Sequence, residues 1–251
     1  MAENLFIERL DAQEVHLPQI MEDLDFSIRS LFYHGMEQRL FDFFQIKPNM
    51  RILDLGCGTG FLTEWLYRTY PDHELEIVGV DLQETLLSKA TERANAASFP
   101  IVYMRGDAHA LSFADDSFDL IVSHTLIKWV EEPKRVLSEM YRVLKQDGLL
   151  CIGERILPPV FLSKDRIDQI VQRKTESMMN SIPHPQIALE LPERMNQMGM
   201  REVDCIAFSV PTRMGKTGEA LRNFESKIET TGNREQVRLF IHQLLWASGR
   251  K

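Results

Sequence analysis

The sequence has few cysteines and lacks any long apolar run. Its 251 residues include three cysteines, Cys57, Cys151 and Cys205, which stand far apart and form no CxxC pair. This spacing favours neither a zinc site nor a disulfide framework, so we expect them to be small core residues and expect no metal. No apolar stretch approaches the roughly 20 residues that a membrane helix requires.

Positive charge is also in short supply. The chain has 29 Lys and Arg against 37 Asp and Glu, a net charge of −8. Because nucleic-acid binding depends on cations that neutralise phosphates, we expect no nucleic-acid partner. The first ten residues carry Glu3, Glu8 and Arg9 where a signal peptide would be apolar. We therefore expect a cytoplasmic protein without membrane insertion, and the oligomeric state stays open, a homo-oligomer included.

The middle of the chain alternates short β-branched runs with helical patterns. This alternation, between Arg51 and Gly153, is typical of βαβ units on a parallel sheet. Asp147-Gly148 predicts a turn between the last helix and the last strand of this region. The predicted strands are 51–55, 75–81, 101–105, 118–123 and 149–154, and the predicted helices are 61–70, 83–97 and 133–144.

The flanks are less regular. Apolar residues at helical spacing predict a helix within 24–44. After the core, Pro158-Pro159 predicts a break in the chain, and 211–234 reads as a polar, helical insertion. The remaining predicted elements are helices at 164–179 and 188–198, the latter ended by Gly199, and strands at 202–210 and 239–246.

The clearest motif runs from Ile52 to Gly60, an apolar strand that enters a turn with glycine at every second position. Glycine permits a positive φ, or lets a ligand approach the backbone without meeting a Cβ. Before a helix, such a turn forms a nucleotide-binding lip. The dinucleotide fingerprint is GxGxxG, but Phe61 stands three positions after Gly58. The spacing therefore disfavours a nicotinamide-dependent oxidoreductase.

A carboxylate follows at a suitable distance. Asp81 closes the strand that begins near Ile77, about 20 residues after the glycines, where an acid can accept both ribose hydroxyls of a bound nucleoside. Asp81 alone would suit NAD equally well, so the glycine spacing decides between the two ligands.

An acid followed by GxGxG resembles the first motif of class I S-adenosylmethionine-dependent methyltransferases, and the resemblance extends over about 51–154. It implies an α/β fold: a three-layer Rossmann-like sandwich with a mostly parallel seven-stranded sheet in the order 3-2-1-4-5-7-6 and an antiparallel last strand. We predict one domain over 1–251. It comprises an N-terminal helical cap (1–48), a cofactor-binding core (49–155) and the remaining core with substrate-lid insertions (156–251).

The resemblance implies S-adenosylmethionine as cofactor and S-adenosylhomocysteine as product. In similar enzymes the acid matching Asp107 accepts the adenine amino group, and the next backbone N–H, here of Ala108, serves a ring nitrogen. We interpret the adjacent His109 as a surface residue. Tyr33 and Arg39 could bind the cofactor's carboxylate or close the lid. An ordinary surface or helix-packing role is an equal alternative for both. The other implied contacts are Asp54, Gly56, Cys57, Gly58, Gly60, Asp81, Leu82 and Ser123.

By the same resemblance, the segment Ser123–Trp129 passes under the methionine part of the cofactor, and its first residues face the transfer site. His124 is a candidate general base, because an unperturbed imidazole titrates near neutrality. A role in packing or local hydrogen bonding is equally open for His124. We expect Trp129 to pack against the following helix.

These features predict methyl transfer to a small-molecule acceptor by in-line displacement, as in the broad family that includes quinone-biosynthesis and biotin-pathway carboxyl methyltransferases. Such transfer needs alignment and exclusion of water rather than a covalent nucleophile, which is why no catalytic residue stands out. The mixture of Met178-Met179 with His184-Pro185 suits a small, partly apolar acceptor. The alternatives are a methyltransferase acting on protein or RNA and a non-catalytic cofactor-binding protein.

Overall fold

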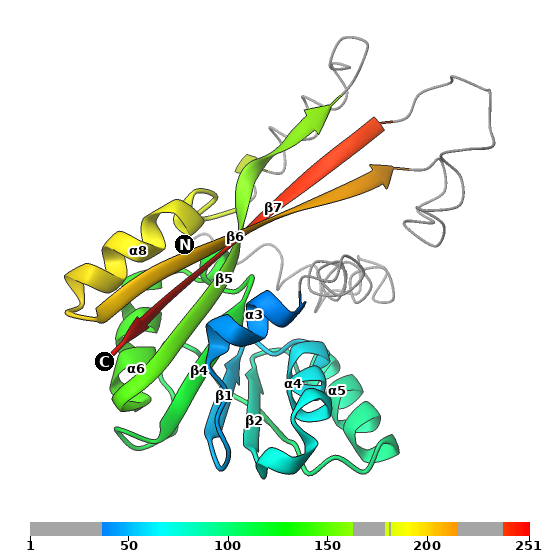
Figure 1. The fold of residues 1–251 in the computed structure, drawn as a ribbon, viewed down its shortest axis with the longest axis vertical. Helices are drawn as coiled ribbons and strands as arrows, with labels where there is room; N and C mark the ends of the chain where they lie inside the picture. The colour runs from blue at the N-terminus through cyan, green and yellow to red at the C-terminus, as the bar shows by residue number, and fades with distance from the viewer. Residues whose placement is uncertain (1–36, 163–178, 181, 215–237) are drawn as a thin grey trace.

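The structure is a computed structural model, and it describes residues 37–162, 179–180, 182–214 and 238–251 (Figure 1). Most of its elements lie within one or two residues of the predicted bounds. The strands are β1 (Arg51–Leu55), β2 (Glu76–Asp81), β3 (Val102–Arg105), β4 (Phe118–His124), β5 (Leu144–Leu162), β6 (Arg201–Met214) and β7 (Arg238–Arg250). The helices are α3 (Glu37–Phe44), α4 (Phe61–Thr69), α5 (Glu84–Ala96), α6 (Pro133–Val143) and α8 (Ile187–Gln197), with short 3-10 helices η1 (Pro71–His73) and η2 (Ile127–Trp129).

The strands form one seven-stranded sheet in the order β3-β2-β1-β4-β5-β7-β6. Neighbours from β3 to β5 pair in parallel, and β7 pairs antiparallel with both β5 and β6. This confirms the predicted strand order and the antiparallel last strand. Since β1 and β4 are neighbours from which the chain proceeds in opposite directions across the sheet, the ligand crevice is expected above their carboxyl ends.

Local sequence explains the elements that surround this crevice. Four of the five residues of β1 are buried, as expected for a strand covered on both faces. Helix α4 starts directly after Gly60 and ends before Pro71, whose ring cannot continue a helix. Helix α6 opens on Pro133, which is tolerated in the first turn because no intrahelical N–H bond is lost there.

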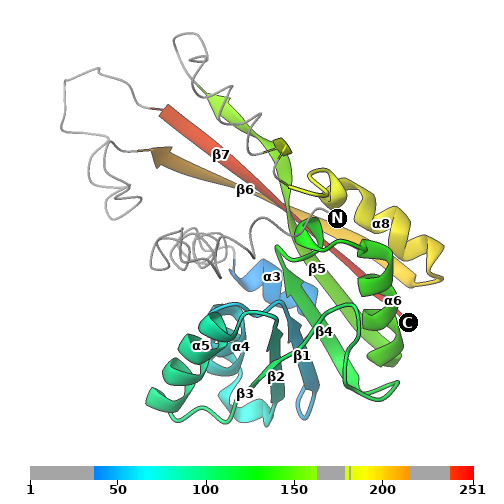
Figure 2. The ribbon, with the colours of Figure 1, turned by 180° about the vertical axis from the view of Figure 1, so that it is seen from behind.

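Two apolar cores sandwich the sheet. One lies under α3 and α4 and includes Phe44, Leu66 and Trp246, and the other lies under α6 and α8. Helices α4 and α5 stand beside β1 and β2, whereas α6 and α8 stand beside β5, β6 and β7; Figure 2 shows the same arrangement from behind. The longest strands, β5, β6 and β7, run on past the ends of β1, β2 and β4 (Figure 1).

Strand β5 corrects two predictions. The predicted turn at Asp147-Gly148 lies inside β5, where the pairing with β4 shifts register and Asp147 takes a φ of 59°. The predicted break at Pro158-Pro159 is also wrong, because β5 continues to Leu162. Its pairing with β7 is interrupted between Ile156 and Val160, and such an irregularity tolerates residues without an N–H.

The end of β6 corrects a third prediction. We predicted a helical insertion from Pro211, but 211–214 continue β6 and pair with β7 as far as Arg238. Pro211 is tolerated because β6 is an edge strand, where one N–H need not enter the ladder. The other parts of the predicted insertion and of the helices within 24–44 and 164–179 lie largely outside the described residues.

None of the helices in the described part of the chain combines the length and the apolar character of a membrane span.

Candidate functional site

The glycine turn follows β1 and bends the chain back toward α4. Gly56, Gly58 and Gly60 all have positive φ, at 76°, 54° and 75°. Space is open at Gly58, where a Cβ would meet no atom within 4 Å, so its backbone is accessible from outside. The N–H groups of Gly56 and Cys57 both donate to the carbonyl of Val80, at 2.7 and 3.1 Å, and thereby fix the turn to β2.

Asp54 lies beneath this turn and is 1% exposed. The Thr63 hydroxyl, on the first turn of α4, donates to Asp54 Oδ2 at 2.5 Å. Burial raises the pKa of Asp54 to about 7, opposed by the Thr63 hydrogen bond and assisted by the nearby Asp81 carboxylate. Asp54 is thus poised between its neutral and ionised forms near neutral pH.

Asp81 joins the turn to the start of α5. Its Oδ2 accepts the Gly58 N–H at 2.9 Å, and its Oδ1 accepts the Gln83 N–H at 2.9 Å. Burial raises the pKa of Asp81 although these hydrogen bonds act to lower it. Each carboxylate oxygen keeps a further lone pair, so Asp81 can accept a pair of hydroxyl groups in addition.

The neighbours of Asp81 are apolar. Leu82 exposes 39% of its surface, whereas Cys57 is buried within the turn. The Leu82 carbonyl accepts the Arg105 Nε at 3.2 Å, which links the end of β2 to the end of β3. The Leu82 side chain therefore forms an accessible apolar surface beside the carboxylate of Asp81.

Asp107 follows β3 and is held by His109. Asp107 Oδ1 accepts the His109 backbone N–H at 2.9 Å and contacts His109 Nδ1 at 2.7 Å. The His109 Nε2 contacts the backbone N–H of Glu132 at 3.3 Å, which assigns the proton to Nδ1. Burial acts to raise the Asp107 pKa, but the hydrogen bonds from His109 outweigh it and hold the pKa below its ordinary value. His109 is half-buried and orients Asp107, a role that our interpretation of it as a surface residue did not include.

The carboxyl end of β4 brings Ser123 and His124 together. Ser123 is fully buried, and its hydroxyl has no hydrogen-bond partner among the described residues. The half-buried His124 stacks on Trp246 of β7, with ring centroids 5.5 Å apart and planes at 15°. Gly153 of β5 pairs with both residues, and any Cβ on it would overlap the indole. A glycine in the middle strand therefore lets two rings from its neighbours meet.

The charge around His124 keeps the imidazole neutral. Burial first, and then the cations Lys128 and Arg155, hold the pKa of His124 well below its ordinary value. Lys128 is itself buried against Glu154, with Nζ and Oε2 3.0 Å apart. The Lys128 carbonyl also accepts the His184 N–H at 3.1 Å, which brings the segment before α8 against η2. Sequence reasoning missed this ion pair, because nothing local links residues 26 positions apart.

Two predicted site residues lie elsewhere. Tyr33 is outside the described residues. Arg39 is exposed on α3, and its guanidinium lies 5.4 Å from the ring centroid of Phe208 on the edge strand β6. The structure therefore places Arg39 by β6, whereas the glycine turn lies between β1 and β2.

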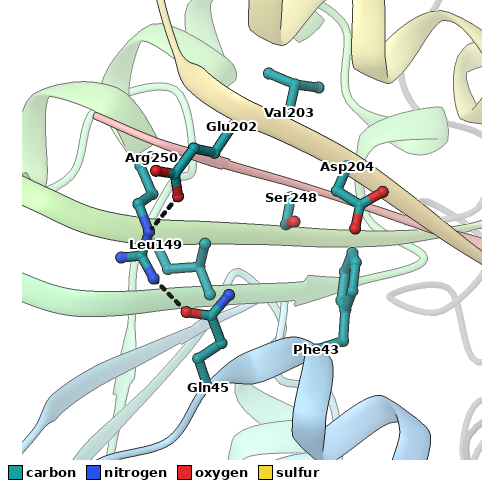
Figure 3. Close-up of a pocket in the computed structure, with 8 residues that line it drawn as sticks. All are labelled: Phe43, Gln45, Leu149, Glu202, Val203, Asp204, Ser248 and Arg250. Carbon is teal, nitrogen blue, oxygen red and sulfur yellow. Dashed lines mark hydrogen bonds and ion pairs between the residues drawn. The ribbon is translucent and has the colours of Figure 1, made fainter.

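The sheet also carries a pocket of about 350 Å³ that contains none of the predicted site residues (Figure 3). It is lined by Phe43, Gln45, Leu149, Glu202, Val203, Asp204, Ser248 and Arg250. Leu149 pairs through Leu120 with the start of β1, so the pocket lies at the opposite end of the sheet from the glycine turn. Arg250 crosses its mouth, bonding Glu202 at 3.0 Å on one side and Gln45 on the other.

Among the described residues, no group of three or more His, Cys, Asp or Glu side chains is arranged to hold a metal ion. The arrangement at the glycine turn instead offers bare backbone, the buried carboxylate of Asp54, the half-buried carboxylate of Asp81 and an accessible apolar side chain. These groups suit a nucleoside with a short polar extension.

Comparison with known sequences identifies this core. Residues 53–152 match the family described as "Methyltransferase domain". Residues 53–152 therefore carry a methyltransferase domain. This stretch contains the glycine turn, Asp81, Asp107 and His124. The resemblance inferred from the motifs is thereby confirmed.

Individual relatives extend the comparison. The demethylmenaquinone methyltransferase of Renibacterium salmoninarum is 37% identical over 107 residues, 43% of this chain and 42% of the relative. A malonyl-[acyl-carrier protein] O-methyltransferase of Coxiella burnetii is 28% identical over 214 residues, 76% of this chain and 71% of the relative. Three other matches span only 19% to 45% of the length of the curated relatives.

The fold has solved counterparts. The YcgJ protein of Bacillus subtilis superposes with a TM-score of 0.63 at 19% identity, covering 87% of this chain and 99% of that one. At this identity the likeness concerns the fold alone, and it agrees with the three-layer arrangement around the methyltransferase domain.

Proposed function

We propose that the protein transfers a methyl group from S-adenosylmethionine to a small-molecule acceptor. The observation that carries the proposal is the Asp81 carboxylate, which is fixed by the N–H groups of Gly58 and Gln83 beside an open stretch of backbone. A carboxylate fixed in this way can accept two vicinal hydroxyls without reorganising, which is the contact that a ribose offers. The buried hydroxyl of Ser123, which has no hydrogen-bond partner in the described part of the chain, further supports a polar ligand near the end of β4.

S-adenosylmethionine supplies an activated methyl group on a cationic sulfur. The chain's own residues then have four tasks. Asp81 and Asp107 hold the two ends of the nucleoside, Leu82 covers the base, and Asp54 provides negative charge beneath the turn. The segment after β4 orients the acceptor, which replaces a bimolecular encounter by an aligned one. None of these tasks requires a covalent bond to the protein.

His124 is the candidate proton acceptor. With its pKa held well below the ordinary value, its imidazole is neutral at neutral pH, and a neutral imidazole can take a proton from an acidic acceptor. The same low pKa makes it a weak base, so it suits an acceptor whose proton is readily lost. A positioning role through the stack on Trp246 remains the competing assignment, and His124→Ala separates the two, because loss of a base lowers the methylation rate more than cofactor affinity.

Small-molecule acceptors are favoured by the names of the relatives, which describe methyl transfer to demethylmenaquinone and to malonyl-[acyl-carrier protein]. Both can serve as probes in an assay with methyl-labelled S-adenosylmethionine. The net charge of −8 supports the absence of a nucleic-acid partner. We likewise propose a cytoplasmic location and a single domain over 1–251, to be tested by fractionation and limited proteolysis. Light scattering determines the oligomeric state, a homo-oligomer being one of its outcomes.

Calorimetry tests the proposal directly. S-adenosylmethionine and S-adenosylhomocysteine should bind, and NAD should not. Asp81→Ala is expected to weaken binding by more than about tenfold, because it removes charge-assisted contacts. Asp72→Ala, which removes an exposed acid in η1, is the matched control and should bind as the wild type does. Tight NAD binding, or full affinity in Asp81→Ala, would reject the assignment.

A further inference from the structure

Tyr103 connects the third strand of the sheet to the glycine turn. It lies on β3, where it pairs with Gly79 of β2, and Gly79 in turn pairs with Asp54 of β1. The three residues form one row across the sheet, so their side chains share one face. In this row the middle position has no side chain, and a long side chain from β3 can therefore reach β1.

The Tyr103 ring occupies the space that a side chain would need at two glycines. A Cβ on Gly79 would overlap the ring carbons of Tyr103, and a Cβ on Gly60 would overlap its phenol oxygen. Gly60 also has a φ of 75°, which side chains rarely adopt. Gly60, the last glycine of the turn, is therefore required for two reasons: its backbone has a positive φ, and a side chain there would overlap Tyr103.

The phenol is bonded to the turn. Tyr103 Oη donates to the carbonyl of Gly60 at 3.3 Å. Burial is the main cause that raises the pKa of Tyr103, so it stays a protonated donor across the physiological range. A hydrogen bond with the Thr63 hydroxyl acts in the opposite direction on that pKa, and Thr63 donates to Asp54. The Tyr103 hydroxyl thus interacts both with Gly60 at the end of the turn and with Thr63, which binds Asp54 beneath the turn.

We infer that Tyr103 is a positioning residue for the cofactor: its hydroxyl holds the carbonyl of Gly60, and its ring fills the space over Gly79, so that the turn keeps an open conformation. This inference rests on the proposed function, because it concerns the same cofactor site. It adds to the site a residue of β3 whose phenol contacts the turn at Gly60. Tyr103 acts through Gly60 and Thr63 and does not itself touch the cofactor.

Tyr103→Phe tests the inference, because it removes the hydroxyl and keeps the ring. The dissociation constant of S-adenosylhomocysteine, measured by calorimetry, should rise roughly twofold to tenfold, the range expected for one neutral hydrogen bond. The melting temperature without ligand should stay close to that of Tyr141→Phe, a control that removes a phenol from α6 on the other face of the sheet. Tyr141→Phe should bind S-adenosylhomocysteine as the wild type does.

A double-mutant cycle distinguishes positioning from general support of the fold. Thr63→Val and Tyr103→Phe should show non-additive losses of affinity, because both act on one connected cluster. Additive losses, or an unchanged affinity in Tyr103→Phe, would overturn the inference while leaving the proposed function intact. A wild-type chain that binds neither S-adenosylmethionine nor S-adenosylhomocysteine would instead overturn the proposed function, and the inference with it.

Discussion

We expect Asp54 to make cofactor binding dependent on pH. Its carboxyl is 1% exposed and its pKa is raised to about 7 by burial. A cationic sulfonium ligand favours the ionised form, so at low pH part of the binding free energy is consumed in removing a proton. If only the ionised form binds, the apparent affinity between pH 8 and pH 6 falls about tenfold, equivalent to about 1.4 kcal/mol. Asp81, whose pKa is also raised by burial, acts in the same direction.

S-adenosylhomocysteine provides the internal comparison. It carries the same amino acid group, but its sulfur is neutral. Its affinity should fall less than that of S-adenosylmethionine over the same interval. Calorimetry in buffers of different ionisation enthalpy at pH 7 should count about half a proton released per S-adenosylmethionine bound, since a group with this pKa is half protonated there.

The unliganded protein should respond in the opposite sense. A carboxyl whose folded pKa lies above its unfolded value contributes stability at low pH, and this contribution is lost as pH rises through the folded pKa. With a rise from 3.8 to about 7, the loss by pH 8 is on the order of 4 kcal/mol. Asp54→Asn should therefore raise the melting temperature at pH 8 and weaken cofactor binding. The exposed acid variant Asp72→Asn should do neither.

The reasoning is refuted by either of two results. One is equal affinity for S-adenosylmethionine at pH 6 and pH 8. The other is an Asp54→Asn variant that retains the full pH dependence of binding, which would place the titration on another group. His124 does not interfere in this window, because its pKa lies well below the ordinary value.

The carboxyl ends of β4 and β5 give two further predictions. Gly153→Ala should displace the Trp246 indole, admit water to His124 and raise the imidazole pKa toward its ordinary value, read from NMR titration of the His124 ring; an unchanged titration would show that the stack does not shield the ring. Lys128→Met should cost about 3–5 kcal/mol in denaturant unfolding, because Glu154 is left buried as an unpaired charge. The double variant Lys128→Met, Glu154→Leu should recover most of this loss, and failure to recover would mean that packing, rather than charge, is the cause.

Local signals predicted the core because they are carried by neighbouring residues. Apolar strands, the glycine turn and Pro133 each act within a few positions, and the elements from β1 to α6 appear close to where they were expected. The errors arise where the pairing of strands in the sheet, rather than the local sequence, determines the secondary structure. Pro158-Pro159 and Pro211 were interpreted as breaks, yet an interrupted ladder and an edge strand accommodate residues that lack an N–H.

The site was predictable in part for the same reason. Asp81 is the last residue of its strand and can therefore be recognised in the sequence. Tyr103 and Trp246 reach the site only through the register of the sheet, which the linear sequence does not display. The available signal was a glycine within each of two buried strands, Gly79 and Gly153, because glycine at such a position marks the close approach of another group.

These two glycines act in the same way, because each leaves space for an aromatic ring from a neighbouring strand. Gly79 admits the ring of Tyr103 toward β1, and Gly153 admits the ring of Trp246 toward β4. Because β1 and β4 are the neighbouring strands above which the ligand crevice is expected, an aromatic ring from each flank supports one wall of that crevice. A rigid ring has few rotamers to lose, so it fixes a turn or an imidazole at low entropic cost. The precision of the site therefore depends on residues two strands away from it, and substitutions at Tyr103 and Trp246 should alter binding and proton affinity before they alter the fold.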